Sequence, residues 1–324
     1  MDIWHGLAAV PSDLAESVVT IGVFDGVHRG HQHLLRRAVA EATRRGVPCV
    51  MVTFDPHPVS VFLPERAPAR LTSLEERLRL AGEQGVDAVL VVNFTCELAG
   101  LSPRHYFSSL LVDTLKAVAV LVGENFTFGR DAEGTVETLH DLCDEYGVED
   151  IVVGLYHDRG QRLCSSLVRR YLAEGDIEGA NWALGRPFRV TGKVVHGAGR
   201  GGKELGYPTA NQYFPESMAL PADGVYAGWL TVVDSGPIAG DMVAERRYPA
   251  AISVGTNPTF GDEPRSVESF VIEREANLYG HTATVEFVER LRPMVKFHGV
   301  QELLDAMGDD VKRAREILGD KVWG

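Results

Sequence analysis

Short apolar segments alternate with amphipathic ones along the first half of the chain. Apolar, β-branched runs predict buried strands, and apolar residues spaced three or four apart predict the helices that cover them. Strands are expected at residues 18–23, 47–54, 86–94, 117–123 and 148–155. Helices are expected at residues 31–46, 73–84, 103–116 and 135–146. Repeated strand–helix units predict a parallel, doubly wound sheet, which binds ligands at the carboxyl ends of its strands.

The pattern changes after two short helical segments at residues 165–174 and 177–184. Later runs are short and β-like, and turns rich in Gly and Pro separate them. These runs cover residues 189–195, 225–233, 250–254, 267–272 and 282–288. In the last run apolar and polar residues alternate, which is typical of a half-buried antiparallel strand.

A small antiparallel β-barrel is the fold expected for the second half, because closure leaves no exposed sheet edge. An apolar stripe at residues 300–318 predicts a terminal helix that packs on this barrel. Gly185-Arg186-Pro187 indicates the boundary, so the domains are expected at residues 1–186 and 187–324. Two domains also suit a chain of 324 residues.

Composition narrows the classes of protein. A net charge of −13 argues against a nucleic-acid binder, which usually carries a basic stripe. The longest apolar run, residues 117–122, is too short to span a bilayer, and the N-terminus lacks the pattern of a signal peptide. The four cysteines form no Cys-x-x-Cys pair and do not cluster with histidines, so neither a disulfide framework nor a zinc site is expected. A cytoplasmic protein fits these features.

The segment Gly22-Val23-Phe24-Asp25-Gly26-Val27-His28-Arg29-Gly30-His31 joins the first strand to the first helix. Amides at a helix start favour anions, and Gly26 and Gly30 let the backbone approach a phosphate closely. His28 and His31 share a helical face, where two imidazoles can donate hydrogen bonds to a triphosphate. The alternatives are surface histidines or a metal pair, but zinc needs three or four ligands and no third is evident nearby.

This segment resembles the His-x-Gly-His signature of the nucleotidylyltransferase superfamily. Its longer form is similar to that of the bacterial bifunctional riboflavin kinase/FMN adenylyltransferase family. The resemblance implies a Rossmann-like domain in which the FMN phosphate attacks the α-phosphorus of ATP, so that FAD forms and pyrophosphate leaves. It implies catalytic roles for His28 and His31. It further implies contacts with ATP for Gly22, Phe24, Asp25, Gly26 and Gly30.

Two loops that follow strands also match this family. In Thr53-Phe54-Asp55-Pro56-His57-Pro58, the resemblance implies that Phe54, Asp55 and His57 bind the flavin nucleotide. The alternative is that Phe54 belongs to the core and the prolines only shape the loop. In Gly123-Glu124-Asn125-Phe126-Thr127-Phe128-Gly129, Asn125 is the expected ATP-binding residue, whereas the two phenylalanines pack.

A further match is Cys164-Ser165-Ser166-Leu167-Val168-Arg169, where the family usually has Ser-Ser-Thr-x-Ile-Arg. Ser165, Ser166 and Arg169 suit a phosphate at a helix start, although an N-cap serine is the alternative. Cys164 stands in place of the first Ser and is a weaker hydrogen-bonding group. A competent kinase with a weak adenylyltransferase is therefore a second hypothesis, which the Cys164→Ser variant tests.

Gly206-Tyr207-Pro208-Thr209-Ala210-Asn211 lies in the β-rich half. The proline restricts its neighbour, which would hold the hydroxyl of Thr209 and the amide oxygen of Asn211 as ligands for Mg²⁺. A simple turn is the alternative. The glycine-rich segment before it is either a linker or a phosphate-covering loop. Together, these two segments resemble a riboflavin kinase domain. The resemblance implies ATP-binding roles for Gly197, Gly199 and Lys203.

Glu268 shares its strand face with Phe270 and Ile272, and periodicity does not decide which face is buried. The resemblance implies that Glu268 is the base that takes the proton of the riboflavin 5′-hydroxyl. It implies a flavin contact for Arg292, and riboflavin, FMN and ATP as substrates. Family members can assemble through both domains, so the resemblance allows a homo-oligomer.

Two hypotheses from other classes are kept. A flavin-delivery protein would bind flavin without consuming ATP. An aminoacyl-tRNA synthetase-like enzyme would share the His-x-Gly-His site, but the chain is small and acidic and has no Lys-Met-Ser-Lys-Ser segment.

Overall fold

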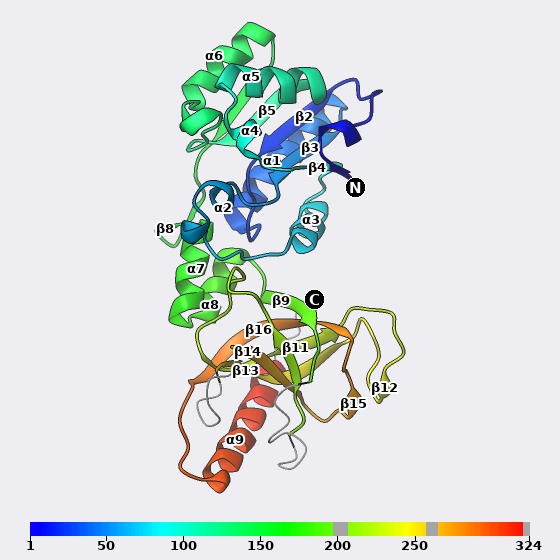
Figure 1. Cartoon of the computed structure of the whole chain (residues 1–324), viewed down its shortest axis with the longest axis vertical. Coiled ribbons are helices and arrows are strands. Elements are labelled where there is room, and N and C mark those ends of the chain that lie inside the picture. Colours follow the sequence, from blue (N-terminus) through cyan, green and yellow to red (C-terminus); the bar gives the residue numbers. More distant parts are fainter. Residues whose placement is uncertain (197–206, 257–264, 320–324) are drawn as a thin grey trace. The chain divides into compact units, whose positions relative to one another are not determined.

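The computed structural model describes residues 1–196, 207–256 and 265–319. Contacts between residues divide the chain into two compact units, Met1–Ser165 and Ser166–Gly324 (Figure 1). Each unit is described by itself. Gly197, Gly199 and Lys203, which the sequence places in a phosphate-covering loop, lie outside the described residues.

A six-stranded sheet forms the centre of the first unit, in the order β1-β4-β3-β2-β5-β6. All its pairings are parallel, which confirms the predicted doubly wound sheet. From β2 the chain builds the sheet first towards β3 and then, on the other side, towards β5, so β2 marks the switch point. The strands are β1 (Asp2–His5), β2 (Ser17–Ile21), β3 (Cys49–Phe54), β4 (Ala88–Val92), β5 (Ala117–Gly123) and β6 (Glu149–Val153).

Helices cover both faces of this sheet because each buried strand presents apolar side chains to both sides. Helices α1 (Arg29–Arg45) and α3 (Leu74–Glu83) pack on one face. The helices α5 (Pro103–Tyr106), η3 (Phe107–Thr114) and α6 (Val136–Tyr146) pack on the other.

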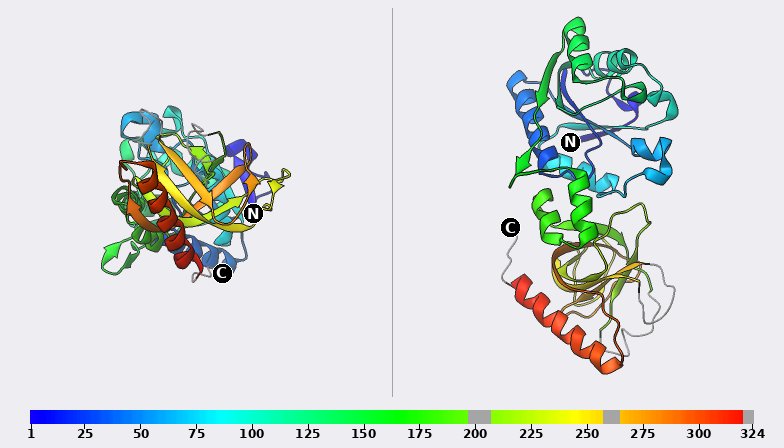
Figure 2. Two further views of the ribbon diagram at one scale, coloured as in Figure 1. Left: turned by 90° about the horizontal axis from the view of Figure 1, so that it is seen from below. Right: turned by 90° about the vertical axis from the view of Figure 1, so that its left-hand side faces the viewer.

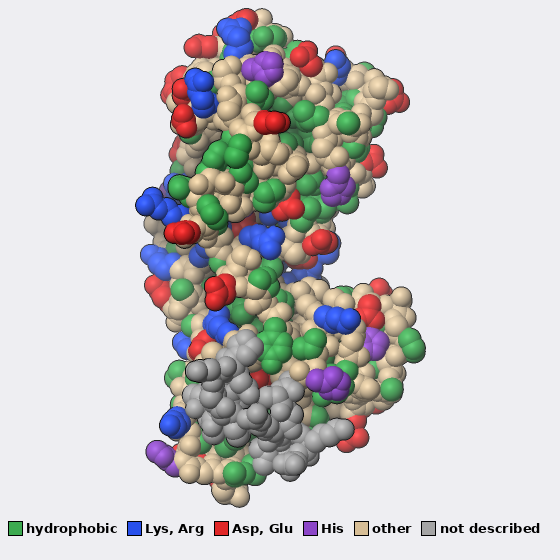
Figure 3. All heavy atoms as spheres, in the orientation of Figure 1, with side chains coloured by type: hydrophobic (Ala, Val, Ile, Leu, Met, Phe, Trp, Pro, Cys, Tyr) green, Lys and Arg blue, Asp and Glu red, His purple; other side chains and the backbone are tan. Residues whose placement is uncertain are grey.

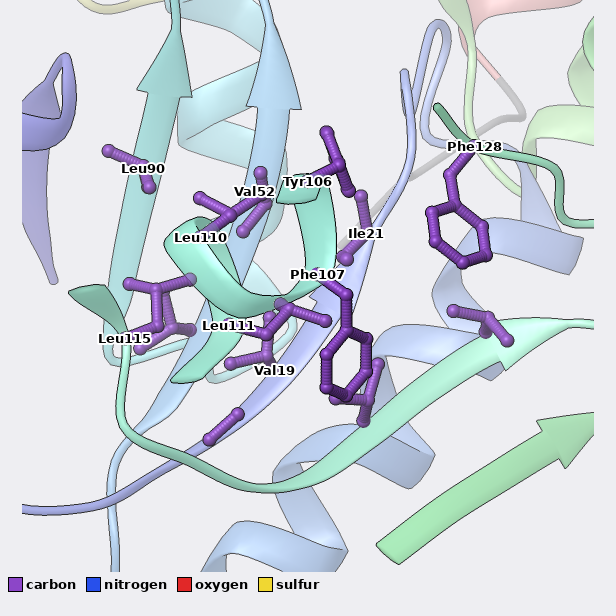
Figure 4. Close-up of a cluster of buried hydrophobic side chains, with 14 of the residues drawn as sticks. Val19, Ile21, Val52, Leu90, Tyr106, Phe107, Leu110, Leu111, Leu115 and Phe128 are labelled. Atoms are coloured by element: carbon purple, nitrogen blue, oxygen red, sulfur yellow. The ribbon is translucent and has the colours of Figure 1, made fainter. Parts of the chain in front are cut away.

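The segment expected as one α-helix at residues 103–116 is helical, but it is not a single α-helix. One α-helical turn is followed by the π-helix η3, which ends at Thr114. The amide of Leu115 donates to the carbonyl of Leu110, five residues earlier, at 3.0 Å. This wider turn directs Phe107, Leu110 and Leu111 into the core (Figure 4).

Short elements of the first unit were not expected, because a few residues carry no readable periodicity. They include β1 and the hairpin of β7 (His157–Asp158) and β8 (Gln161–Arg162). The others are η1 (Leu7–Ala9), α2 (Pro58–Phe62), η2 (Pro64–Arg66), α4 (Cys96–Ala99) and η4 (Arg130–Ala132).

The second unit holds an antiparallel sheet with the order β10-β14-β13-β11-β16-β9. An isolated bridge between Val195 and Asn211 links its two ends, so the sheet is a nearly closed barrel, as predicted. The strands are β9 (Phe188–Lys193), β10 (Ala210–Tyr213), β11 (Gly224–Val232), β13 (Arg247–Gly255), β14 (Ser266–Val271) and β16 (Thr282–Pro293). The helices α7 (Ser165–Glu174) and α8 (Ile177–Leu184) precede it, and β12 (Ala239–Gly240) pairs with β15 (Ala276–Asn277).

The barrel has an aromatic interior and a helix on its outside. Inside, the ring of Phe287 packs against those of Phe188 and Tyr226. Outside, the predicted terminal helix α9 (Val300–Gly319) lies against the barrel (Figure 2). Its residues Ala314 and Leu318 pack with residues of the sheet. None of the described helices combines the length and the apolar character that crossing a membrane requires. Acidic and basic side chains are interspersed on the face drawn in Figure 3.

Candidate active sites

The loop between β2 and α1 has an unusual backbone for its residues. Phe24 and Val27 have positive φ angles of 52° and 38°, and Gly26 has a φ of 81°. Residues other than glycine seldom adopt such φ angles unless packing holds the backbone there. Phe24 and Val27 are each only 1% exposed, so the core fixes this loop at the carboxyl end of β2.

His28 and His31 meet at the start of α1, as their spacing predicted. His28 is the N-cap residue, and its Nδ1 accepts a hydrogen bond from the amide of His31 at 3.3 Å. The two rings stack with centroids 3.6 Å apart, and Phe24 packs edge-on against His31. Two imidazoles therefore lie beside the positive end of the α1 dipole.

Burial lowers the pKa of His31 well below 6.5, and the charges of His28 and Arg77 lower it further. His31 is therefore neutral at pH 7, with one ring nitrogen that donates and one that accepts. Its Nδ1 is buried and has no hydrogen-bond partner in the part of the chain that the structure describes. This nitrogen keeps hydrogen-bonding capacity at the site.

Asp25 belongs to this loop and is 2% exposed. Its carboxylate accepts hydrogen bonds from the amides of Leu71 and Thr72 at 3.0 to 3.2 Å. Its carbonyl accepts a bond from the hydroxyl of Ser165 at 2.9 Å. We infer that Asp25 anchors the loop, and a direct contact with ATP stays a prediction.

The loop after β3 carries the residues that the sequence assigned either to flavin binding or to the core. Phe54 is 7% exposed and belongs to the core, where its ring packs edge-on against Phe94. The Asp55–Pro56 peptide bond is cis. Asp55 and His57 are half-buried, and His57 caps α2 by accepting a hydrogen bond from the amide of Val59 at 3.1 Å.

The remaining candidates of the first site lie at different depths. Asn125 is exposed after β5, while Cys164 and Ser165 are half-buried after the β7–β8 hairpin. The loops after β2, β3 and β5 all leave the same edge of the sheet, because the three strands are parallel. Ser166 is exposed and Arg169 is half-buried, and both belong to the second unit.

Sequence reasoning missed one buried cation near this site. Arg77 on α3 is 2% exposed and donates from Nη1 to the hydroxyl of Thr53 and the carbonyl of Phe54. Leu74, Arg77, Leu78 and Ala81 follow the spacing of an apolar helix stripe, and three of them are apolar. A charged residue on that stripe was the signal.

In the second unit, candidate residues form one row across the sheet. Asn211 on β10 pairs with Glu268 on β14, and Glu268 pairs with Ser253 on β13. The row continues through Val225 on β11 to Arg292 on β16. Directly opposite residues share a face and hold their Cβ atoms about 4.5–5.5 Å apart. Strand pairing thus brings Asn211, Glu268 and Arg292 onto one face.

This row lies on the outside of the barrel. Val225 packs with the residues of α9, whereas Val267 and Ser269 alternate with Glu268 and are at most 1% exposed. Glu268 is half-buried on the outer face, which settles the question that periodicity left open. The hydroxyl of Ser266 donates to its Oε1 at 3.0 Å, so the carboxylate is oriented.

Thr209 and Asn211 lie side by side. Nδ2 of Asn211 donates to the Thr209 carbonyl at 3.0 Å and lies 3.3 Å from its hydroxyl oxygen. This separation joins a nitrogen to an oxygen, whereas Mg²⁺ takes oxygen ligands. The amide oxygen would reach an ion shared with Thr209 only if the amide turned and gave up its bond to the Thr209 carbonyl.

Arg292 is held by α9. Its guanidinium makes a two-point contact with Asp310, with Nε and Nη2 at 2.7–3.0 Å from the carboxylate oxygens. The guanidinium carbon also lies 5.4 Å from the centre of the Phe297 ring. Arg292 and Asp310 line a surface cavity of about 360 Å³. The structure therefore gives Arg292 a clear structural partner, and its contact with flavin stays a prediction.

Comparisons with known proteins agree with this division into two sites. Residues 10–167 match the family model of FAD synthetase, and residues 184–318 match that of riboflavin kinase. The bifunctional riboflavin kinase/FMN adenylyltransferase of Escherichia coli K12 is 35% identical and covers 97% of this chain and 96% of its own length. The protein of the same name from Bacillus subtilis is 31% identical, with 96% of each chain covered.

A solved structure that aligns with this chain comes from Streptococcus pneumoniae and is described as a macrolide-efflux protein. Its TM-score is 0.84 at 29% identity, and the alignment covers 97% of this chain and 99% of that one. The likeness therefore extends over both units.

Proposed function

The chain belongs to the bifunctional riboflavin kinase/FMN adenylyltransferase family, and we propose how its two sites divide the two reactions. The enzyme phosphorylates riboflavin with ATP to give FMN, and it adenylylates FMN with a second ATP to give FAD. This activity replaces the hypotheses of a flavin-delivery protein and of a synthetase-like enzyme. We propose a domain boundary at residues 186/187, close to residue 184, where the riboflavin kinase match begins.

We assign adenylyl transfer to the carboxyl edge of the parallel sheet. The observation that carries this assignment is the stacked pair of His28 and His31 at the start of α1. An oxygen of the FMN phosphate attacks the α-phosphorus of ATP, and the bond to pyrophosphate breaks. No covalent intermediate is needed, so the two histidines position the triphosphate and stabilise the leaving charge.

Other groups complete this first site in the proposal. The backbone of the β2–α1 loop approaches the phosphates, with polar side chains from later segments beside it. The residues proposed for ATP are Gly22, Phe24, Asp25, Gly26, Gly30, Asn125, Ser165, Ser166 and Arg169. Those proposed for FMN are Phe54, Asp55 and His57, from the loop after β3.

We assign riboflavin phosphorylation to the outer face of the barrel. Glu268 takes the proton of the riboflavin 5′-hydroxyl, whose oxygen then attacks the γ-phosphorus of ATP. Thr209 and Asn211 would hold Mg²⁺, which supplies positive charge to the ATP phosphates when it is bound. The pairing of Asn211 with Glu268 supports this, because it sets the metal ligand beside the base. Gly197, Gly199 and Lys203 are proposed to cover the phosphates, and Arg292 to border the flavin.

The setting proposed for the enzyme is the cytoplasm. All four cysteines are free thiols, and Cys49 and Cys143 are buried. Such thiols suit a reducing compartment, where ATP and riboflavin are also available. A homo-oligomer is compatible with this proposal.

A time course with riboflavin, ATP and Mg²⁺ tests both assignments. FMN should appear first and FAD second in the intact enzyme. Glu268→Gln should slow FMN formation by about 10²–10⁴-fold, which is the usual loss for a general base, and still convert added FMN to FAD. His28→Ala should accumulate FMN. Glu273→Gln is the control, because Glu273 is an exposed acid that follows the same strand. FAD formation at the normal rate by His28→Ala would contradict the first assignment.

A further inference from the structure

Arg77 is a buried charge with no part in the two reactions as assigned. Its side chain is 2% exposed on α3, and its Nε is buried without a hydrogen-bond partner in the segments that the structure describes. Burial of a guanidinium is costly unless other charges or hydrogen bonds compensate. The carboxylates of Asp25 and Asp55 are near enough to oppose the effect of burial on the pKa of Arg77. Both belong to loops of the adenylyl-transfer site.

Hydrogen bonds connect Arg77 to the same two loops. Its Nη1 donates to the Thr53 hydroxyl at 3.1 Å and to the Phe54 carbonyl at 3.0 Å. The Thr53 hydroxyl has one proton, which it donates to the carbonyl of Val23 at 3.0 Å. Through Thr53, Arg77 is therefore connected to the β2–α1 loop, which leads to the two histidines. Through the Phe54 carbonyl, it holds the residue from which the loop after β3 begins.

We propose that Arg77 is a positioning residue for adenylyl transfer, which fixes the loops after β2 and β3 relative to each other. This inference rests on the proposed assignment of ATP to the first loop and FMN to the second. The reaction needs the FMN phosphate and the α-phosphorus of ATP close together and aligned, about 3–3.5 Å apart. A shift of one loop against the other would lengthen that approach, and a misplacement of 1 Å can cost about 10²-fold in rate.

A residue that only packs would behave differently. Its loss would lower the stability of the first unit without changing catalysis in the protein that stays folded. A positioning residue lowers the rate of one reaction in folded protein. The riboflavin kinase reaction of the same chain serves as an internal reference for folding and concentration.

The experiment uses the full chain with Arg77→Met, Arg77→Lys and Thr53→Val. Arg77→Met should lower kcat for FMN adenylylation by about 10²-fold and leave riboflavin phosphorylation within about twofold. Arg77→Lys should recover part of the loss, because an ammonium can still donate to one oxygen. Thr53→Val should lower the rate of FMN adenylylation by about 3- to 10-fold, since it removes the connection to Val23 and leaves the bond from Arg77 to the Phe54 carbonyl.

The control variant is Arg79→Met. Arg79 lies on the same helix, but it is exposed and pairs with Glu76 and Glu83, so both activities should persist. A folded Arg77→Met enzyme that adenylylates FMN at the normal rate would overturn the proposal. If that variant does not fold, Thr53→Val decides, and an unchanged adenylylation rate there overturns it. Failure of the site assignment itself would show separately, as normal FAD formation by His28→Ala.

Discussion

His31 has its protonation fixed by the residues around it. Burial, then His28, then Arg77 lower its pKa well below 6.5, so the folded protein keeps the imidazole neutral. The unfolded chain binds this proton near pH 6.5, before the folded protein does. The contribution of neutral His31 to the free energy of unfolding is therefore fully present above pH 6.5. This contribution is lost as the pH falls towards the lower pKa of the folded protein.

We predict that the free energy of unfolding falls between pH 7 and pH 5. A single such proton contributes at most about 1.4 kcal/mol per pH unit, and His31→Gln should remove that contribution. Urea unfolding of the wild type and the variant at a series of pH values measures both slopes. Equal slopes would contradict the prediction.

His140 provides a control of opposite sign. A hydrogen bond from its ring to Asp150 raises the pKa of His140 above 6.5. Its contribution to stability is thus present below pH 6.5 and is lost as the pH rises through the folded pKa. His140→Gln should therefore not flatten the fall in stability between pH 7 and pH 5, because the contribution of His140 grows as the pH falls through 6.5.

At the scale of elements, Arg292 and Asp310 connect β16 to α9. Asp310 is 5% exposed and accepts the two-point contact from the guanidinium. Removal of one partner of a buried ion pair costs about 3–5 kcal/mol, and less where the other partner can reach water. The side chain of Arg292 is 21% exposed, so part of that loss should be recovered by hydration.

Asp310→Asn should therefore lower the free energy of unfolding of the second unit by about 1–3 kcal/mol. We also expect a higher KM for riboflavin with little change in kcat, since Arg292 is proposed to border the flavin and not to act in the chemistry. Asp305→Asn, at an exposed position of the same helix and outside the lining of the cavity, is the matched control. A normal KM in a destabilised Asp310→Asn enzyme would separate the helix contact from flavin binding.

The sequence predicted the long elements, and it failed where the pairing of distant segments decides which candidate residues meet. The stacking of His28 on His31 follows from a spacing of three residues on a helix. The row formed by Asn211, Glu268 and Arg292 cannot be derived from sequence spacing, because strand register is set by contacts between distant segments. Arg77 was missed for a related reason. Its position on an apolar stripe was readable, but its partners on β3 were not.

At the scale of the molecule, the groups that carry the two assignments belong to different units. The histidine pair lies within Met1–Ser165, and the row from Asn211 to Arg292 lies within Ser166–Gly324. The product of the kinase is the substrate of the adenylyltransferase. If each site is complete within one chain and FMN is released between the two steps, FMN made by one chain can be used by another.

Two variants that are each blocked at one step should therefore complement each other. Glu268→Gln alone should leave riboflavin unchanged, and His28→Ala alone should stop at FMN. Mixed at equal concentration with riboflavin, ATP and Mg²⁺, they should form FAD after a lag while FMN accumulates in solution. Excess unlabelled FMN should dilute the label of FAD made from labelled riboflavin, because the intermediate diffuses. FAD formation by the wild type that resists this dilution, with none in the mixture, would instead mean that FMN passes between sites without release.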